Sequence, residues 1–185
     1  MTDTHYAVHS IESAPEQSRP ALLGLKQRFG LVPNLAATMA ESPTLVNNFV
    51  AALMGFSGGT FTPGERQVLL LTNAVTNQSA WAVAFHSTAA LGEGVTADAV
   101  AAIRDGRLPA EPKLAALSRF TRSLIESRGH VRGKALDAFL AAGFTRAQVL
   151  EVIAGLAVSV MANYAGNVAP PPLEAPFQAQ VWAAK

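Results

Sequence analysis

The chain contains no cysteine and few charged residues. None of its 185 residues is a cysteine, and only 15% are Asp, Glu, Lys or Arg, against roughly 25% in a typical globular domain. Without thiols the protein can form no disulfide, no thiolate metal site and no cysteine nucleophile. The scarcity of charge indicates that part of the surface is covered by a partner.

An excess of charge of either sign is also missing. The formal net charge is +1, and the Lys and Arg residues are scattered along the chain. Proteins that bind nucleic acid usually carry a clustered basic surface. We therefore expect no nucleic-acid partner.

The sequence lacks the patterns of targeting and membrane-spanning segments. Its first stretch, MTDTHYAVHSIESAPEQ, has no basic start followed by an apolar core, as a secretory signal would have. The longest apolar run, residues 152–162, has about half the length that a bilayer span needs. These features predict a cytoplasmic protein that does not enter a membrane.

Strand patterns are missing too, whereas helical patterns are frequent. No stretch alternates apolar and polar residues between hairpin turns. We expect an all-α fold of about eight helices in a single domain, residues 14–185, preceded by an arm of residues 1–13. The expected helices cover residues 16–29, 34–40, 43–56, 62–76, 79–92, 96–106, 112–128, 134–142 and 145–169, and residues 173–182 form a docked tail.

Capping residues mark several of these helix starts. Asn34 is expected to cap the short helix that ends at residue 40. Ser42 precedes a proline, Thr62 stands three residues before Glu65, and Thr145 stands three residues before Gln148. A hydroxyl followed by Glu or Gln at this spacing is typical of a capping box. Glu65 then has a sufficient structural role as a cap, and a catalytic role is the alternative.

Two histidines near the N-terminus, His5 and His9, are candidate metal ligands. They are four residues apart and would share one face of a helix, but the neighbouring Ser, Thr and Pro residues disfavour a helix there. Further ligands for a metal are missing from this stretch. We expect a solvated arm and no metal site.

The segment of residues 65–92 holds the polar side chains that are candidates for catalysis or ligand binding. It is apolar along most of its length, and His86 lies near its end. Such a segment is typical of a buried helix or helix pair. A buried imidazole must find a hydrogen-bond partner, and its protonation normally changes near neutral pH.

Residues 77–86, NQSAWAVAFH, resemble the core motif of the carboxymuconolactone decarboxylase and alkylhydroperoxidase D-like superfamily. Redox members carry Cys-x-x-Cys, three further residues and a His. Ser79 and Ala82 stand in the two cysteine positions, and His86 stands in the histidine position. Gln67 replaces the proton-relay glutamate of redox members, and Trp81 stands where an aromatic residue is usual.

Two flanking stretches extend the resemblance to residues 29–182. They are FGLVPNL at residues 29–35, followed by Ser42 and Pro43, and NYAGN at residues 163–167 together with the tail to Trp182. They resemble the peroxidase-related subgroup. The resemblance implies the alkylhydroperoxidase D-like helical fold and self-association as a trimer or as a hexamer built from dimers.

The resemblance also implies a function that needs no thiol and no cofactor. Cysteine-free members with the same histidine suggest a lyase or decarboxylase that acts on a small carboxylated or lactone ligand by acid–base chemistry. His86 would move the proton, Gln67 and Ser79 would orient the substrate, and Trp81 and Ala82 would line the pocket. The nearby cation, Arg66, is adjacent to Gln67 and is expected on another helix face.

Other interpretations of these residues stay open. A Ser79–His86 nucleophile pair would be separated by about 10 Å along one helix, which is too far for proton transfer. The protein could instead be a non-catalytic small-molecule binder or a degenerate structural homologue, with His86 as a core residue.

Two polar residues of the last helix have alternative roles as well. Glu151 either favours the positive end of the helix dipole or binds substrate beside His86. Asn163 either forms a structural hydrogen bond or lines the pocket.

Overall fold

The structure, a computed structural model, describes residues 6–183, and within this range it contains helices and no β-strand. Eight α-helices have eight or more residues, which confirms the predicted all-α fold of about eight helices. His5 lies outside the described residues. The elements are η1 (Glu16–Ser18), α1 (Arg19–Phe29), α2 (Asn34–Met39), α3 (Pro43–Ser57), α4 (Pro63–Thr76), α5 (Ala80–Gly92), α6 (Ala97–Arg104), α7 (Pro112–Glu126), α8 (Lys134–Ala141), α9 (Arg146–Val168) and η2 (Ala175–Gln180).

The helix starts that carry capping residues lie where the sequence predicts them. The Ser42 hydroxyl accepts a hydrogen bond from the backbone N–H of Leu45 at the start of α3. Thr62 with Glu65 opens α4, and Thr145 with Gln148 opens α9, each as a complete capping box. These contacts are local in sequence, so the sequence alone determines them.

The N-terminal helices differ from the prediction in two details. The helix expected over residues 16–29 begins as the 3-10 turn η1, and α1 starts at Arg19, which is followed by Pro20. Asn34 was expected to cap α2, but it is the first residue of that helix. Its side-chain Nδ2 donates to the Pro172 carbonyl at 2.9 Å, so it binds the C-terminal tail instead.

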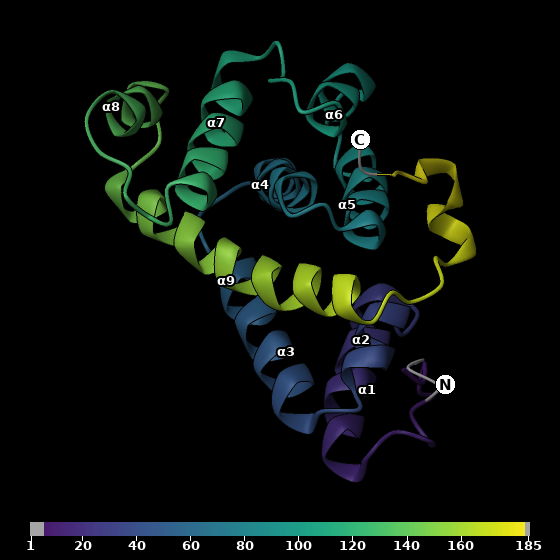
Figure 1. Cartoon of the computed structure of the whole chain (residues 1–185). Coiled ribbons are helices and arrows are strands. Elements are labelled where there is room, and N and C mark those ends of the chain that lie inside the picture. Colours follow the sequence, from purple (N-terminus) through teal and green to yellow (C-terminus); the bar gives the residue numbers. More distant parts are fainter. Residues whose placement is uncertain (1–5, 184–185) are drawn as a thin grey trace.

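Helix α4 is the centre of the molecule. Figure 1 shows it nearly end-on, between α5, α7 and α9. Its residues 68–74 are all buried, as predicted for a helix without a solvent face. Burial on all sides places the polar residues of α4 either in hydrogen bonds or against cavities.

A sharp break separates α4 from α5. Gln78 adopts a positive φ of 55°, and the N–H of Ser79 donates to the Ala74 carbonyl at 2.9 Å. The helix breaks here, as predicted, and the chain then reverses so that α5 packs along α4. The reversal brings Gln67 of α4 opposite His86 of α5.

The C-terminal tail docks on α5 as expected. Phe177 of η2 is buried, and its ring lies 5.1 Å from that of Phe85 and 6.1 Å from that of Trp81. Trp182 Nε1 donates to the Arg104 carbonyl at 3.1 Å. At the other end of the described chain, His9 Nε2 contacts Glu41 Oε2 at 2.7 Å, which gives this histidine a partner within the fold.

Helix α9 is the longest helix, with 23 residues. Among the described residues it is the one helix that is long and apolar enough to cross a membrane by length and composition, and 39% of its most apolar window is buried. Core helices meet the same criteria. In this fold α9 packs against α3 and α4.

Candidate functional site

His86 is held by a hydrogen bond between the two central helices. Its Nδ1 lies 3.0 Å from Gln67 Oε1. An amide oxygen can only accept a hydrogen bond, so Nδ1 carries the proton and Nε2 keeps its lone pair. The Phe85 ring meets the imidazole edge to face at 5.1 Å.

The surroundings of His86 keep the imidazole neutral. Burial lowers the pKa of His86 from its ordinary 6.5 to about 3. Gln67 contributes a neutral dipole where redox relatives are expected to have a carboxylate, so it supplies no charge that would offset burial. At neutral pH His86 therefore offers an acceptor, Nε2, and no positive charge.

An apolar cavity of about 50 Å³ lies on one side of His86. Trp81 and Ala82 of α5 and Ser159 of α9 are among the residues that line it. The Ser159 hydroxyl is buried and has no hydrogen-bond partner among the described residues. The space is comparable to one or two water molecules, so it admits one small substituent of a ligand.

A wider cavity of about 590 Å³ also borders His86. Gln67, Arg66 and Arg28 line it together with His86. The two cavities share five lining residues, which are Phe29, Leu53, Leu70, Phe85 and His86. His86 therefore stands at the junction of a narrow apolar space and a wider space with two guanidinium groups.

The expected orientation of Arg66 was wrong. Neighbouring residues on a helix point about 100° apart, which led to the prediction that Arg66 and Gln67 face different surroundings. The structure places both on one cavity, because Arg66 has a long side chain that folds back and donates from Nη1 to the Phe61 carbonyl at 2.6 Å. A cation therefore lines the same cavity as His86.

Trp81 forms a fixed wall of the apolar cavity. Its ring stacks on Phe85 with a centroid distance of 5.1 Å and an angle of 13°. Its Nε1 donates to Glu174 Oε2 at 2.8 Å, and Glu174 Oε1 accepts from the backbone N–H of Asn34 at 2.6 Å. Glu174 thus ties the tail, α2 and α5 together.

Ser79 lies behind the site. Its hydroxyl is buried without a hydrogen-bond partner among residues 6–183 and packs against Gly166 of α9. Ser79 is not among the lining residues of either His86 cavity, whereas Ala82 lines the apolar one. The imidazole Nδ1 pairs with Gln67, so Ser79 and His86 do not form a nucleophile pair.

Glu151 and Asn163 do not line these two cavities either. Glu151 Oε2 accepts from the backbone N–H of Thr60 at 2.8 Å and from its hydroxyl at 3.2 Å. This carboxylate therefore holds the loop between α3 and α4. Asn163 is buried, and its Nδ2 has no partner in the described part of the chain.

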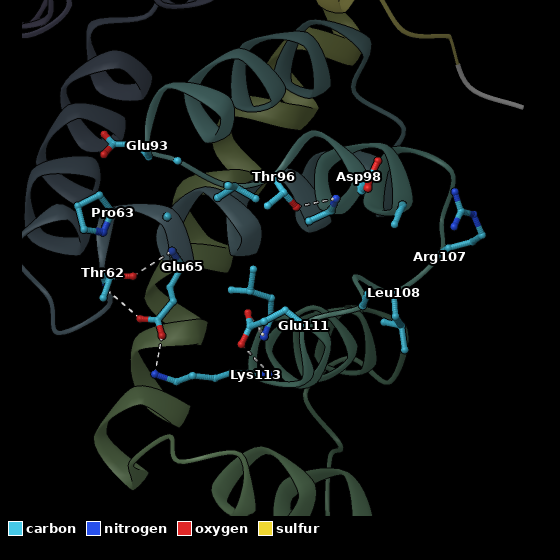
Figure 2. Close-up of a pocket in the computed structure, with 17 residues that line it drawn as sticks. Thr62, Pro63, Glu65, Glu93, Thr96, Asp98, Arg107, Leu108, Glu111 and Lys113 are labelled. Atoms are coloured by element: carbon cyan, nitrogen blue, oxygen red, sulfur yellow. Dashed lines mark hydrogen bonds and ion pairs between the residues drawn. The ribbon is translucent and has the colours of Figure 1, made fainter.

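Glu65 has the structural role that its capping position predicts. Its Oε2 accepts from the Thr62 N–H at 2.9 Å, and its Oε1 lies 2.7 Å from Lys113 Nζ (Figure 2). Burial alone raises the pKa of the Glu65 carboxyl, but Lys113 and Thr62 outweigh it and the net pKa is lowered. Both oxygens are occupied at the edge of a separate open cavity of about 850 Å³.

Three residues of the site were not predicted from the sequence. Arg28, Ser159 and Glu174 come from α1, α9 and the tail, far in sequence from His86. The available signals were weak: an arginine beside an aromatic residue, a serine within an apolar helix and a carboxylate after three prolines. Within residues 6–183, no group of three or more His, Asp or Glu side chains could hold a metal ion.

Comparison with known proteins gives a family match over part of the chain and a fold for the whole of it. Residues 40–123 match the model of the carboxymuconolactone decarboxylase family. The comparison with curated proteins gives no match.

Solved structures resemble the whole chain. An alkylhydroperoxidase AhpD core, an uncharacterized peroxidase-related protein from Ralstonia eutropha JMP134, is 20% identical with a TM-score of 0.83, over 98% of this chain and 97% of that one. The debrominase Bmp8 is 17% identical with a TM-score of 0.78, over 97% of each chain. A variant of this debrominase in complex with 2,3,4-tribromopyrrole is 18% identical with a TM-score of 0.76, over 97% of this chain and 96% of that one. Residues 40–123 are therefore similar to the carboxymuconolactone decarboxylase family, and the chain as a whole has the alkylhydroperoxidase D-like fold.

Proposed function

We propose that this protein binds a small carboxylated or lactone molecule beside His86 and acts on it by proton transfer, as a lyase or decarboxylase that uses no thiol. The observation that carries the proposal is the place of His86, between an apolar cavity and a cavity with two arginines. A ligand with an apolar body and one anionic group matches both. The binding of 2,3,4-tribromopyrrole by a structural relative supports a small cyclic ligand.

The two arginines supply the charge that a carboxylate needs. Arg66 makes one hydrogen bond in the described chain, through Nη1, which orients its guanidinium. The Arg28 guanidinium lies 5.7 Å from the Phe29 ring centroid, over an aromatic face that also belongs to the cavity wall. Guanidinium groups bind carboxylates in a paired geometry that an ammonium group cannot match.

An anionic ligand would also change the chemistry of His86. The free protein has a neutral imidazole because burial lowers its pKa to about 3. A carboxylate within about 4–6 Å favours the protonated form and raises the pKa. The ligand would thereby convert Nε2 from a hydrogen-bond acceptor into a proton donor.

A decarboxylation can then be balanced with these groups. The bond between the α-carbon and the carboxylate breaks, CO₂ leaves, and the electron pair moves into the lactone carbonyl as an enolate. The α-carbon takes a proton from His86 Nε2, and solvent returns a proton to the imidazole. Gln67 holds the ring in place through Nδ1 during both steps.

The second candidate is a binding protein without catalysis. It is favoured by the same low pKa of about 3, because an imidazole that resists protonation is a weak general acid in the free protein. Ser79, Ala82 and Gln67 replace reactive groups expected from the redox relatives with unreactive ones of similar size. In a binding protein without catalysis, His86 Nε2 would only accept a hydrogen bond from the ligand.

Ligand binding is tested by thermal shift with a panel of carboxylated lactones and aromatic acids, each paired with its methyl ester. A ligand at a hundred times its Kd adds roughly 2.7 kcal/mol of stability. We expect an acid to stabilise the wild type, its ester to lose most of the effect, and His86→Gln to bind at least tenfold more weakly. Arg122→Gln, at an arginine that lines neither of the two His86 cavities, is the control for Arg66→Gln.

Catalysis is tested with the best ligand, by measuring release of labelled CO₂ from its carboxyl group. Release by the wild type and its loss in His86→Gln support the decarboxylase. Binding without release supports the second candidate. Equal binding by the wild type and His86→Gln, or an absence of any ligand in the panel, contradicts a ligand site at His86.

A further inference from the structure

Ser159 of α9 has a buried hydroxyl that forms no hydrogen bond within the fold. The residue is 3% exposed, and its Oγ has no partner among residues 6–183. A hydroxyl inside a helix can donate to the carbonyl four residues earlier. Thr72, Thr76 and Thr88 do so at 2.7, 2.7 and 3.0 Å, whereas Ser159 does not. Burial of this hydroxyl therefore costs free energy that the described chain does not offset.

The position of Ser159 distinguishes it from other buried side chains with an unpaired polar atom. Within the described part of the chain, it is the only one of them that lines a cavity at His86. Two other polar groups of the same wall already have partners, since Trp81 Nε1 donates to Glu174 and His86 Nδ1 pairs with Gln67. The side-chain polar atoms of this wall that stay available to a ligand are the Ser159 hydroxyl and His86 Nε2.

The apolar cavity and its hydroxyl restrict the ligand group that can enter. The volume of about 50 Å³ admits one small substituent. A methyl group would leave the Ser159 hydroxyl unpaired, and a carboxylate would exchange its water shell for a single hydrogen bond. A hydroxyl substituent would need His86 Nε2 as an acceptor, and the proposed reaction uses this atom as a proton donor. A carbonyl oxygen is small and neutral and only accepts, so it fits both the space and the donor.

We propose that Ser159 donates a hydrogen bond to the carbonyl oxygen of the ligand ring and stabilises the enolate that forms when the carboxylate leaves. This role rests on the proposed function. The ring carbonyl enters the apolar cavity, the α-carbon lies at His86, and the carboxylate extends into the wide cavity with Arg28 and Arg66. The ligand is therefore a ring that carries its carboxylate on the carbon next to its carbonyl.

The Ser159 hydroxyl acts as a donor and keeps its proton throughout. When the bond to the carboxylate breaks, CO₂ leaves and the electron pair forms a double bond between the α-carbon and the carbonyl carbon. The carbonyl pair moves to the oxygen, so negative charge develops on the atom that Ser159 binds. Hydrogen bonds to such an oxyanion are stronger than those to a neutral carbonyl. The proton from His86 Nε2 then reaches the α-carbon and restores the carbonyl.

A nucleophilic role fits Ser159 less well. A serine nucleophile needs a base within hydrogen-bond reach, and Ser159 Oγ makes no hydrogen bond to His86 Nε2 in the described chain. Attack by Ser159 on a lactone would open the ring and leave an acyl-enzyme that is heavier by the mass of the ligand. Mass spectrometry of the intact protein after incubation with the ligand distinguishes the two roles.

Stability without ligand tests the state of the Ser159 hydroxyl. Removal of an unpaired buried hydroxyl removes an unsatisfied group, whereas removal of a paired one breaks a hydrogen bond. Ser118 of α7 is the matched control, because its buried Oγ accepts from Thr72 Oγ1 at 2.9 Å. We expect Ser159→Ala to leave the Tm unchanged or raise it, and Ser118→Ala to lower it by about 2–4 °C.

Two matched rings test the contact with the ligand. They are α-carboxy-γ-butyrolactone and the tetrahydrofuran with its carboxylate at the same ring position, which lacks only the carbonyl. We expect the wild type to bind the lactone about tenfold more tightly than the ether. Ser159→Ala should bind both rings alike, with the affinity of the wild type for the ether. Release of CO₂ from the lactone should fall about a hundredfold in kcat in Ser159→Ala.

Each result that contradicts the proposal has its own signature. Equal binding of the two rings by the wild type overturns the role of Ser159 and leaves a carboxylate site at His86 intact. Binding of neither ring overturns the proposed function together with this role, and tight binding without release of CO₂ overturns the enolate step. Equal losses of Tm in Ser159→Ala and Ser118→Ala, or a covalent adduct that Ser159→Ala abolishes, also contradict a free hydroxyl that acts as a donor.

Discussion

The proposed function depends on His86, and the environment of this residue selects the neutral imidazole. Gln67 fixes the tautomer with a hydrogen bond of 3.0 Å but adds no charge. A carboxylate in the same place would raise the imidazole pKa. Compared with the glutamate that the resemblance implies for redox members, Gln67 has a nitrogen in place of one oxygen, so it holds the imidazole without adding charge.

The lowered pKa predicts how stability depends on pH. The unfolded chain takes up a proton at His86 near pH 6.5, whereas the folded chain takes it up only near pH 3. Between these values the unfolded state binds more protons, so the free energy of unfolding falls as the pH falls through this window. We expect the wild type to lose about 2 kcal/mol more than His86→Gln between pH 7 and pH 5.

Urea unfolding at the two pH values measures this difference. His9, His130 and all carboxylates are the same in both proteins, so their contributions cancel in the comparison. Parallel pH profiles for the wild type and His86→Gln would show that His86 is readily protonated in the folded state. That result would contradict the neutral imidazole on which the site depends.

The sequence could place some of these residues and not others, for a physical reason. One helix, α5, carries His86, Ala82 and Trp81. Their spacing on this helix alone places Ala82 and Trp81 in the wall of the apolar cavity that His86 also lines. Arg28, Ser159 and Glu174 reach the site only through packing of distant segments. Periodicity reports which side of a helix is apolar, but it does not report which helix covers that side.

At the scale of elements, helix starts were more predictable than helix contacts. The capping boxes at Thr62 and Thr145 involve residues three positions apart, so the sequence contains both partners. The misassigned cap, Asn34, binds the tail at Pro172, which lies far along the chain. Hydrogen-bond partners that are distant in sequence compete with local ones, and a local sequence pattern does not show which of them a side chain binds.

The crossing of α9 over α4 depends on a glycine. A Cβ atom at Gly155 would lie 2.6 Å from Leu69 Cδ2 and 3.0 Å from the Phe56 ring. Alanine favours a helix by about 1 kcal/mol over glycine, but overpacking a buried contact costs typically 1–3 kcal/mol. We expect Gly155→Ala to lower the free energy of unfolding by about 1 kcal/mol, measured by urea unfolding.

Gly24 in α1 provides the matched control. No atom lies within 4 Å of the Cβ position there, and the residue has an ordinary helical conformation. Gly24→Ala should therefore raise stability by about 0.5–1 kcal/mol. If Gly155→Ala stabilises the protein as much as Gly24→Ala does, the helices have room to separate and the close crossing is not required.

At the scale of the whole molecule, the C-terminal tail packs on the central helix α5 and ties it to α2. Glu174 links the tail to Asn34 of α2 and Trp81 of α5, and Phe177 lines the wide cavity beside His86. The tail is thus part of the cavity wall and not an appendage. A ligand that fills the wide cavity contacts a segment whose attachment depends on a few polar groups.

Arg104 is the main polar attachment of the end of this tail. It donates from Nη1 to the Gln180 carbonyl and from Nη2 to the Val181 carbonyl, each at 2.9 Å, and Trp182 Nε1 donates back to the Arg104 carbonyl. We expect Arg104→Ala to release the tail while α4 and α5 stay folded. Limited proteolysis should then cut near residues 178–183 at least tenfold faster, and Trp182 fluorescence should shift to the red, with unchanged helical circular dichroism.

Arg122→Ala is the matched control, since Arg122 also donates to a backbone carbonyl at 2.9 Å, that of Gly106 on the α6–α7 connection. Equal cleavage of both variants and the wild type would mean that Phe177 and Glu174 hold the tail without Arg104. The cavity wall would then be fixed by the packing of Phe177 and the hydrogen bonds of Glu174, and ligand entry would have to proceed past Arg28 and Arg66 without movement of the tail.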